Sequence, residues 1–224
     1  MLRPPFWLAV NGQTCRIVAG SEKGSGTCYS EVIVEDCYGM FDYSKRAKPQ
    51  VIVDIGANIG VFSKLCSMLF PNAQIYAYEP NPAALEWLEQ NASDTKITVL
   101  PVAVGDERGT AKFDTSFDST LGRISKSGDL EVTCIAPSDV ADARQIDLLK
   151  IDCEGGEFEI LKDLSLLART RDFCLEYHLF EGKSIEELSS LIEDAGHRIQ
   201  SITPNLGNDQ CGFLRSTRWG ARLR

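Results

Sequence analysis

Two acidic side chains each follow a short apolar run, and a glycine-rich turn comes directly after the first of them. Asp54 follows "VIV" and precedes Gly56, Asn58 and Gly60, while Glu79 follows "YAY". Glycine and asparagine tolerate left-handed backbone, so such a turn lets the chain pass close to a ligand. An acid at a strand tip would repel a diphosphate and favour a cation. The turn therefore predicts a binding site for a ligand that carries positive charge.

Glu79 extends this prediction to the rest of the ligand. A carboxylate at the tip of the next strand can accept hydrogen bonds from both hydroxyls of a ribose. Together, Asp54 and Glu79 indicate a nucleoside with a positive group, and S-adenosylmethionine (SAM) fits through its ribose, ammonium and sulfonium. The alternative is that both acids only cap the adjacent helices.

A second group of polar residues lies further along the chain. In "LLKIDCEGGEFEIL", Asp152 and Glu154 follow an apolar strand, and Glu176 and His178 end the next one, "FCLEYH". Because side chains alternate along a strand, the members of each pair point to the same side. We expect the four side chains to converge where a methyl acceptor would lie. Two alternatives stay open: Asp152 could cap the helix that begins near Glu157, and His178 could be hydrogen-bonded at the sheet edge.

The elements that would position these residues alternate between strands and helices from residue 50 onward. Asn81 and Pro82 form a helix start, and Ser184 with Glu187 makes a capping box ahead of the last helix. Strands are predicted over residues 51–54, 74–78, 97–104, 146–152, 173–178, 198–203 and 210–214, with hairpins and loops between 105 and 135. This alternation predicts an α/β fold, a three-layer sandwich whose mostly parallel sheet carries a C-terminal antiparallel hairpin.

Residues 1–49 break this rhythm. Strands are predicted over residues 6–18 and 31–34, joined by "GSEKGSGT". We therefore expect two parts: a small β-rich N-terminal lead-in over 1–49, which could cover one end of the pocket, and a main domain over 50–224.

The composition limits the class of protein and its partners. The 224 residues suffice for one sizeable core, and acids outnumber bases 32 to 23, which argues against a nucleic-acid-binding surface. No apolar run is long enough to span a bilayer, and the first ten residues lack a signal-peptide pattern, so we expect a cytoplasmic protein without membrane insertion. The eight cysteines form no C-x-x-C pair and are interpreted as reduced, mostly buried hydrophobes.

The motifs resemble those of the FkbM family of SAM-dependent class I methyltransferases. The matching segments are "VDIGANIG", "YAYEPNP", "VAVGDERGT", "DLLKIDCEGGEFEIL" and "LEYH", which span about residues 50 to 180. The glycine motif alone would indicate only the class I fold, whereas "LLKIDCEGGE" downstream is far more specific. The resemblance implies a Rossmann-like sandwich with a seven-stranded sheet. It also implies transfer of a methyl group from SAM, with S-adenosylhomocysteine (SAH) as product, to an oxygen on a small metabolite such as a sugar or polyketide.

The resemblance further assigns residues to the parts of the cofactor. The implied cofactor-binding residues are Asp54, Gly56, Ala57, Asn58 and Gly60 at the methionine part, Glu79 and Pro80 at the ribose, Val102, Ala103 and Val104 beside adenine, and Asp152 between the methionine end and the acceptor. The segment Ser119 to Leu121 stands where the family has a short serine-containing segment and is a weaker candidate for a substrate contact.

Methyl transfer to an alcohol needs alignment of the reactants and removal of the hydroxyl proton. His178, with an ordinary pKa of about 6.5, is the preferred catalytic base, with Asp152 or Glu176 orienting it, and Glu154 is the other candidate. Magnesium is a less favoured alternative. Asp152 and Glu176 resemble the metal-ligand positions of catechol-type O-methyltransferases, but Tyr177 stands where those enzymes have an amide ligand, so no metal ligand is assigned.

Two functions of other classes remain as alternatives. A nicotinamide-dependent oxidoreductase uses a similar sheet, although the D-x-G-x-N-x-G turn is poorly shaped for a pyrophosphate. A non-catalytic SAM-binding module would keep Asp54 and Glu79 without needing the polar cluster. The expected partner is a small-molecule methyl acceptor, and the oligomeric state is left open, with a homodimer as one alternative.

Overall fold

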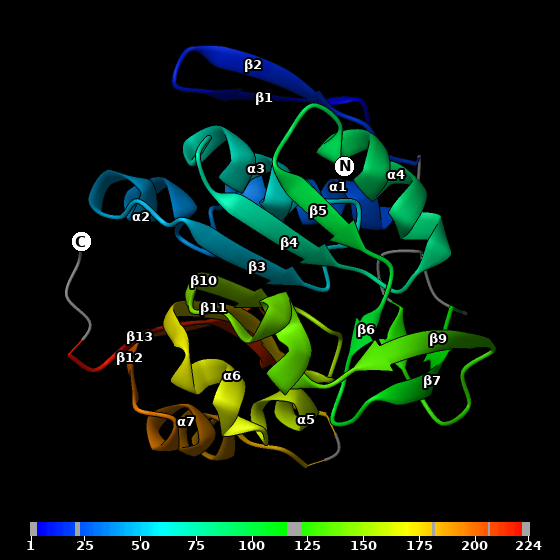
Figure 1. The fold of residues 1–224 in the computed structure, drawn as a ribbon, viewed down its shortest axis with the longest axis vertical. Coiled ribbons are helices and arrows are strands. Elements are labelled where there is room, and N and C mark those ends of the chain that lie inside the picture. Colours follow the sequence, from blue (N-terminus) through cyan, green and yellow to red (C-terminus); the bar gives the residue numbers. More distant parts are fainter. Residues whose placement is uncertain (1–3, 21–22, 116–121, 181, 206, 221–224) are drawn as a thin grey trace.

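A mixed seven-stranded sheet forms the centre of the molecule (Figure 1). The computed structural model describes residues 4–20, 23–115, 122–180, 182–205 and 207–220. The sheet runs in the order β12 (His197–Asn205), β13 (Asn208–Arg218), β11 (Thr170–His178), β10 (Ile146–Ile151), β3 (Val51–Ile55), β4 (Gln74–Tyr78) and β5 (Ile97–Leu100). Neighbouring strands from β11 to β5 are parallel, whereas β13 is antiparallel to both of its neighbours. The predicted α/β sheet with a C-terminal antiparallel hairpin is confirmed.

The strand order creates a switch point between β3 and β10. The chain enters this sheet in the middle, at β3. It continues outward through β4 to β5 and then returns to form β10 on the other side of β3. At such a point the connections leave the two central strands in opposite directions, which opens a crevice beyond their carboxyl ends. The candidate acids at the ends of β3, β4, β10 and β11 all lie at this edge.

Helices cover both faces of the sheet. In Figure 1, α3 (Val61–Leu69) and α4 (Pro82–Ala92) lie above it, while α5 (Glu157–Leu161), α6 (Leu164–Ala168) and α7 (Ile185–Asp194) lie below. Side chains alternate accordingly: Ile52 and Leu148 belong to the core on the α3 side, and Val53 and Leu149 to the core on the opposite side. Ser184 is the N-cap of α7, as predicted, since its hydroxyl accepts the N–H of Glu187.

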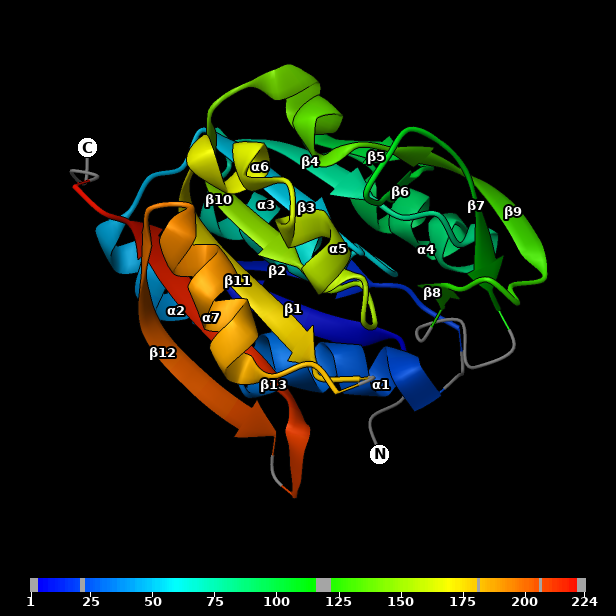
Figure 2. The same ribbon diagram turned by 90° about the horizontal axis from the view of Figure 1, so that it is seen from below.

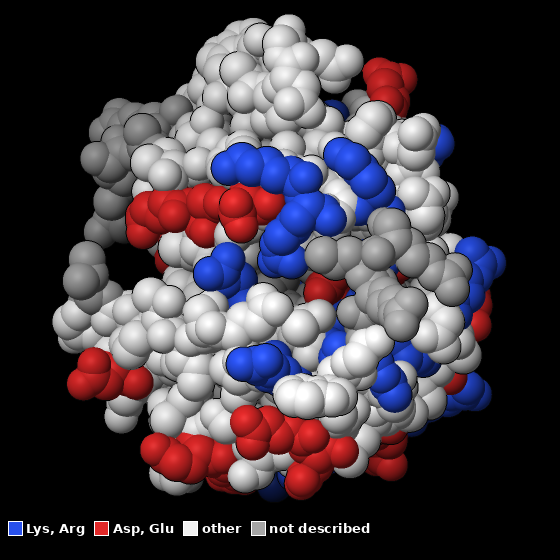
Figure 3. Space-filling view, turned by 90° about the vertical axis from the view of Figure 1, so that its left-hand side faces the viewer, with Lys and Arg blue, Asp and Glu red and all other residues white. Residues whose placement is uncertain are grey.

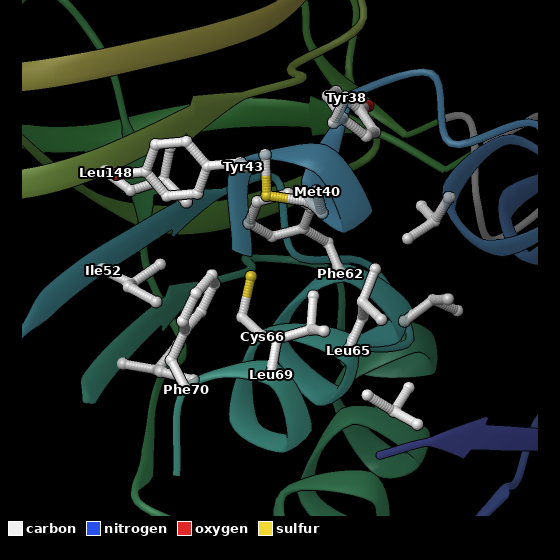
Figure 4. Packing of buried hydrophobic residues seen from close by; sticks show 14 of the residues in the cluster. Tyr38, Met40, Tyr43, Ile52, Phe62, Leu65, Cys66, Leu69, Phe70 and Leu148 are labelled. Carbon is white, nitrogen blue, oxygen red and sulfur yellow. The ribbon is translucent and has the colours of Figure 1, made fainter. Parts of the chain in front are cut away.

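The core on the α3 side depends on the apolar stripe of that helix. Figure 4 shows the side chains of α3 packed between the sheet and the segment that contains α2 (Met40–Arg46). The labelled residues are Phe62, Leu65, Cys66 and Leu69 of α3, Phe70 after it, Ile52 and Leu148 of the sheet, and Tyr38, Met40 and Tyr43 of the N-terminal segment. Burial of each large apolar side chain contributes about 1.5 to 3 kcal/mol. This packing holds the turn before α3 against the sheet.

The N-terminal part contains more helix than expected. The single strand predicted over 6–18 is instead a hairpin of β1 (Phe6–Val10) and β2 (Gln13–Ile17), and residues 23 onward form α1 (Lys23–Tyr29) and the π-helix η1 (Ser30–Val34). The predicted strand over 31–34 is therefore wrong. Three β-branched residues suggested it, yet Val32 is buried in the α3-side core while Val34 is exposed, so packing against α3 decides the conformation.

A separate four-stranded sheet fills part of the connection between β5 and β10. It contains β6 (Ala103–Val104), β9 (Leu130–Ile135), β7 (Gly109–Asp114) and β8 (Arg123–Ile124), in that order, and the 3-10 segment η2 (Pro137–Ala143) follows. The strand predicted over 97–104 is thus divided between two sheets. The hairpins expected between 105 and 135 are confirmed by the antiparallel pairing of β7 with β9.

The surface on the α2 side carries opposite charges next to one another. Figure 3 shows Lys and Arg beside Asp and Glu on this side. Asp42 lies within 4.0 Å of both Lys45 and Arg46, and Arg171 contacts Asp147 and Asp172.

Within the described residues, no helix combines the length and apolarity that crossing a membrane requires. All eight cysteines belong to the described part of the chain, where each is a free thiol.

Candidate functional site

The turn after β3 is built on two glycines that no other residue could replace without strain. Gly56 has a φ of 73°, and a Cβ added there would lie 1.7 Å from the carbonyl oxygen of Asp152. Gly60 has a φ of 84° and stands at the N-cap of α3, where a Cβ would meet Leu88. Asn58, between them, is also left-handed. The glycines therefore allow the β3 turn to pass directly against the loop that follows β10.

Asp54 lies beneath this turn and contacts a lysine rather than an open pocket. Its side chain is fully buried, Oδ1 is 3.1 Å from Lys150 Nζ, and Oδ2 accepts the hydroxyl of Ser63 at 2.7 Å. Asp54 lines neither of the cavities described below. The expectation that this carboxylate faces a ligand cation is corrected: the cation is Lys150, which is paired in register with Asp54 on the adjacent strand β10.

Lys150 joins the two loops at the switch point. Besides Asp54, its ammonium group lies 3.4 Å from Asp152 Oδ2 and donates a 2.7 Å hydrogen bond to the carbonyl oxygen of Gly56. Burial alone would lower the pKa of Lys150, but the charges of Asp54 and Asp152 outweigh burial and raise it above its ordinary value. The lysine is therefore charged and fixes the turn to β10.

Glu79 ends β4 with both carboxylate oxygens held by backbone. Oε2 accepts the N–H of Asn58 at 2.8 Å, and Oε1 accepts the N–H of Asn81 at 2.7 Å. Burial raises the pKa of Glu79 to about 7, although these two hydrogen bonds act in the opposite direction. Each oxygen keeps a lone pair for a further donor. The geometry thus presents a buried, oriented pair of acceptors at the strand tip.

Most of the predicted cofactor residues line a single cavity, which we call the cleft. It encloses about 620 Å³ including its open mouth, within the range of small-molecule sites. Eight predicted cofactor residues line it: Gly56, Asn58, Glu79, Pro80, Val102, Ala103, Val104 and Asp152. Phe113 and Ile124 from the four-stranded sheet add apolar walls that were not predicted. Ser119, Thr120 and Leu121 lie outside the described residues.

A second cavity, which we call the chamber, adjoins the cleft. It holds about 1670 Å³ including its opening, and it shares Gly56, Asn58, Asp152 and Glu154 with the cleft. Its other walls come from α1, η1, β11 and the C-terminal hairpin, and in Figure 2 the label α1 stands beside the tip of the β11 arrow. Ala57 lines the chamber, whereas Gly60 lies against α4 and lines neither cavity. The N-terminal segment therefore contributes part of the chamber wall.

The four predicted polar residues converge in the chamber. Asp152, Glu154, Glu176 and His178 all line it. His178 Nε2 lies 3.4 Å from Glu154 Oε2 and 4.0 Å from Glu176 Oε1. Asp152 Oδ2 instead accepts the hydroxyl of Tyr38 at 3.1 Å and pairs with Lys150. Asp152 therefore neither orients the imidazole nor caps the helix that follows.

Glu157 is the residue that orients His178, and the sequence reasoning did not assign it this role. Glu157 is fully buried, and its Oε1 lies 3.2 Å from His178 Nδ1. The same oxygen accepts the backbone N–H groups of Cys153 and Gly155, both at 3.0 Å. One carboxylate thus connects the "CEGGE" loop to the imidazole. A glutamate at the first position of a short helix, three residues after Glu154, was the available signal.

Electrostatics separate the two candidate bases. Burial alone would lower the pKa of His178, but the hydrogen bond and charge of Glu157, followed by Glu154 and Asp152, raise it to about 10. Burial, then the charge of Asp152, raises the pKa of Glu154 to about 7. At neutral pH the imidazole already carries its proton, whereas Glu154 is partly ionised and can accept one. Within the described residues, no group of three or more His, Cys, Asp or Glu side chains could hold a metal ion.

Curated proteins that resemble this chain are named as methyltransferases. The hexuronic acid methyltransferase AglP of Haloferax volcanii is 26% identical over 152 residues, which cover 65% of this chain and 62% of that protein. The methyltransferase sdnD of Sordaria araneosa is 26% identical over 239 residues, with 85% and 88% covered. The 31-O-demethyl-FK506 methyltransferase FkbM of Streptomyces tacrolimicus is 31% identical over 113 residues, with 50% and 42% covered.

Solved structures support the fold. Magnesium protoporphyrin IX methyltransferase (ChlM) from Synechocystis PCC 6803, a structure with bound SAM, superposes with a TM-score of 0.57 at 10% identity, covering 88% of this chain and 82% of that one. The fibrillarin pre-rRNA processing protein of Methanococcus jannaschii gives 0.51 at 11% identity, with 79% and 69% covered. These likenesses show a class I methyltransferase fold. The model of the methyltransferase FkbM domain matches residues 54–199, and the chain therefore belongs to the FkbM methyltransferase family.

Proposed function

We propose that the protein is a SAM-dependent methyltransferase that methylates a hydroxyl group of a small metabolite. The observation that carries this proposal is the junction of the cleft and the chamber at Gly56, Asn58, Asp152 and Glu154. A donor bound in one cavity and an acceptor bound in the other would meet at this junction. Holding two reactants in line in this way supplies much of the acceleration of a displacement reaction.

The residues of the cleft fit SAM. Glu79 offers two oriented carboxylate oxygens to the hydroxyls of a ribose, and Val102 to Val104 with Phe113 provide an apolar wall for a base. The carboxylates of Asp152 and Glu154 lie at the end shared with the chamber, where a cationic group is favoured. A diphosphate would meet these acids instead of free helix N–H groups, which disfavours a dinucleotide.

The proton of the acceptor hydroxyl must leave as the new oxygen–carbon bond forms. When bound, SAM supplies an electrophilic methyl group and a neutral thioether as the leaving group. We assign the proton to the carboxylate of Glu154, because Glu154 lines both cavities and has a pKa of about 7. The imidazolium of His178, 3.4 Å away and fixed by Glu157, positions that carboxylate. This assignment revises the preference for His178 as base.

Oxygen as the target atom rests on the relatives and on the acceptor chemistry of the chamber. The chain spans only 62% of the length of AglP and 42% of the length of FkbM, so the acceptors of these relatives are not transferred to it. The name of the FkbM relative, a 31-O-demethyl-FK506 methyltransferase, indicates methylation at an oxygen. A carboxylate with a pKa near 7 suits an alcohol, whose proton has to be removed during transfer.

The experiment is transfer of labelled methyl from SAM to an extract of small metabolites. Glu154→Gln should lower turnover at least a hundredfold, since general-base catalysis contributes about 10²–10⁴, while the affinity for SAH stays within about twofold. Glu159→Gln, on the exposed face of α5 next to Lys162, is the matched control and should keep full turnover. Normal turnover of the Glu154 variant together with loss in His178→Ala would return the base role to His178.

A further inference from the structure

The chamber contains more carboxylates than its cations can neutralise. Among the described residues that line it, four are acids, Glu31, Asp152, Glu154 and Glu176, and two are basic, Lys150 and His178. The ammonium of Lys150 is shared between Asp54 and Asp152. The imidazole of His178 is shared between Glu157 and Glu154, and Glu176 lies 4.0 Å from its Nε2. Glu31 and Glu176 are left without a cation of their own.

Glu176 is the clearest case. It is only 9% exposed, and its nearest cationic atom is His178 Nε2, 4.0 Å from Oε1, which is beyond hydrogen-bond distance. No hydrogen bond from the described residues reaches its carboxylate. A buried carboxylate of this kind is costly unless a ligand or a proton compensates it. Glu176 lies on β11 and lines the chamber together with His178.

Glu31 approaches the same space from the opposite wall. It lies on η1 and lines the chamber, and within the described part of the chain its carboxylate makes no ion pair or hydrogen bond. Burial, then the charge of Asp152, raises the pKa of Glu31 to about 7 and that of Glu176 to about 9. Both shifts follow from burial and from the neighbouring charge of Asp152, which disfavour the ionised forms of these two acids. A cation placed between the two walls would reverse them.

The donor in the cleft does not account for these two acids. Asp152 and Glu154 line both cavities and can serve the positive charge of SAM, but Glu31 and Glu176 line only the chamber. The excess of acidic over basic side chains therefore lies on the acceptor side of the junction. Thr27, Asn205 and Asn208 add neutral polar groups to the same walls. An anionic acceptor would be repelled there, and a neutral polyol would leave the surplus uncompensated.

We propose that the methyl acceptor carries a protonated amino group beside the hydroxyl that is methylated, and that Glu31 and Glu176 bind this ammonium. The inference rests on the proposed function and narrows its substrate class to amino alcohols such as amino sugars. In the bound state, the ammonium lies between η1 and β11, and the neighbouring hydroxyl extends toward Glu154 at the junction.

The test uses the full chain, labelled SAM and a small-molecule extract of the organism that carries the gene. Half of the extract is first treated with acetic anhydride, which converts amines into neutral amides, and then with mild base, which restores any esterified hydroxyls. Labelled products are separated on cation and anion exchangers. We expect the label in a product that a cation exchanger retains at pH 6, and we expect at least a tenfold loss of labelling from the acetylated half.

Variants connect this result to the two acids. Glu31→Gln and Glu176→Gln should each lower labelling of the cationic product at least tenfold, because an ammonium loses a buried partner, while SAH affinity stays unchanged in calorimetry. Glu35→Gln, on the exposed end of the same segment, should label normally.

The outcomes separate the two proposals. Label in a neutral or anionic product, or unchanged labelling after acetylation, overturns the ammonium inference and leaves the methyltransferase proposal intact. Normal labelling of the cationic product by both variants overturns the role of Glu31 and Glu176. Tight SAH binding without any labelled product overturns the proposed function, and with it this inference.

Discussion

Replacement of Lys150 with methionine should lower the free energy of unfolding more than a substitution at an exposed position does. Lys150 is 3% exposed and compensates the fully buried carboxylate of Asp54 at 3.1 Å. Methionine fills a similar volume but carries no charge, so Asp54 would keep only the hydroxyl of Ser63. The carbonyl of Gly56 would also lose its 2.7 Å hydrogen bond.

The magnitude follows from these contacts. Removing one partner of a buried ion pair costs about 3 to 5 kcal/mol, and the lost hydrogen bond adds about 1 kcal/mol. We therefore expect the free energy of unfolding to fall by about 4 to 6 kcal/mol, out of a total of about 5 to 15 kcal/mol for a typical domain. Asp54→Asn combined with Lys150→Met removes the stranded charge, so the double variant should recover at least half of this loss.

Equilibrium urea unfolding followed by circular dichroism measures both variants. Lys162→Met, which removes an exposed lysine that pairs with Glu159, is the control and should leave the midpoint unchanged. A decrease of less than about 1 kcal/mol in the free energy of unfolding of Lys150→Met would contradict this expectation, because it is well below the cost of a broken buried pair. The expectation would also be refuted if the effects of Asp54→Asn and Lys150→Met simply added.

Two further predictions concern the cleft. Because Glu79 must be ionised to accept two ribose hydroxyls and its pKa is about 7, SAH affinity should be full above pH 8. It should fall as the pH drops through 7, by up to about tenfold per unit. Calorimetry from pH 5.5 to 8.5 checks this, and a flat profile would contradict it. Gly56→Ala and Gly196→Ala both place a Cβ on left-handed backbone, which costs about 1 kcal/mol. Only the Gly56 substitution also clashes, with the carbonyl oxygen of Asp152. It should therefore lower the melting temperature far more than Gly196→Ala and should also weaken SAH binding. Equal decreases in melting temperature would argue against the close approach of the two loops.

The sequence predicted the parts of the site that depend on strand tips and glycines. Gly56, Asn58 and Glu79 could be assigned to one cleft because the carboxyl ends of parallel strands meet at one edge of the sheet. The convergence of Asp152, Glu154, Glu176 and His178 followed from the alternation of side chains along β10 and β11.

Partner choice within the site could not be predicted in the same way. Spacing gives direction but not distance, so Asp54 was expected to face a ligand, although Lys150 occupies the adjacent register position. A lysine inside the apolar run "LLKI" was the signal, because a buried lysine needs an acid beside it. Glu157 was missed as the group orienting His178 because its contact depends on how the "CEGGE" loop folds back.

The fold was predictable from residue 50 onward and less so before it. Hydrophobic periodicity identifies strands and helices that pack on a sheet, whereas η1 owes its conformation to contacts with α3 that are distant in sequence. Likewise, "ITVLPVAV" is one apolar run in the sequence but contributes β5 and β6 to two different sheets, because Pro101 interrupts the ladder between them.

Titration calorimetry of SAH against the wild type and Glu79→Gln, with NAD in parallel, tests the central claim most directly. We expect SAH to bind the wild type, and Glu89→Gln on the exposed face of α4 to bind it equally well. Glu79→Gln should lose about 10- to 100-fold in affinity, because one charged hydrogen-bond acceptor is worth about 1.5 to 3 kcal/mol. Tight binding of NAD without heat from SAH would contradict the central claim.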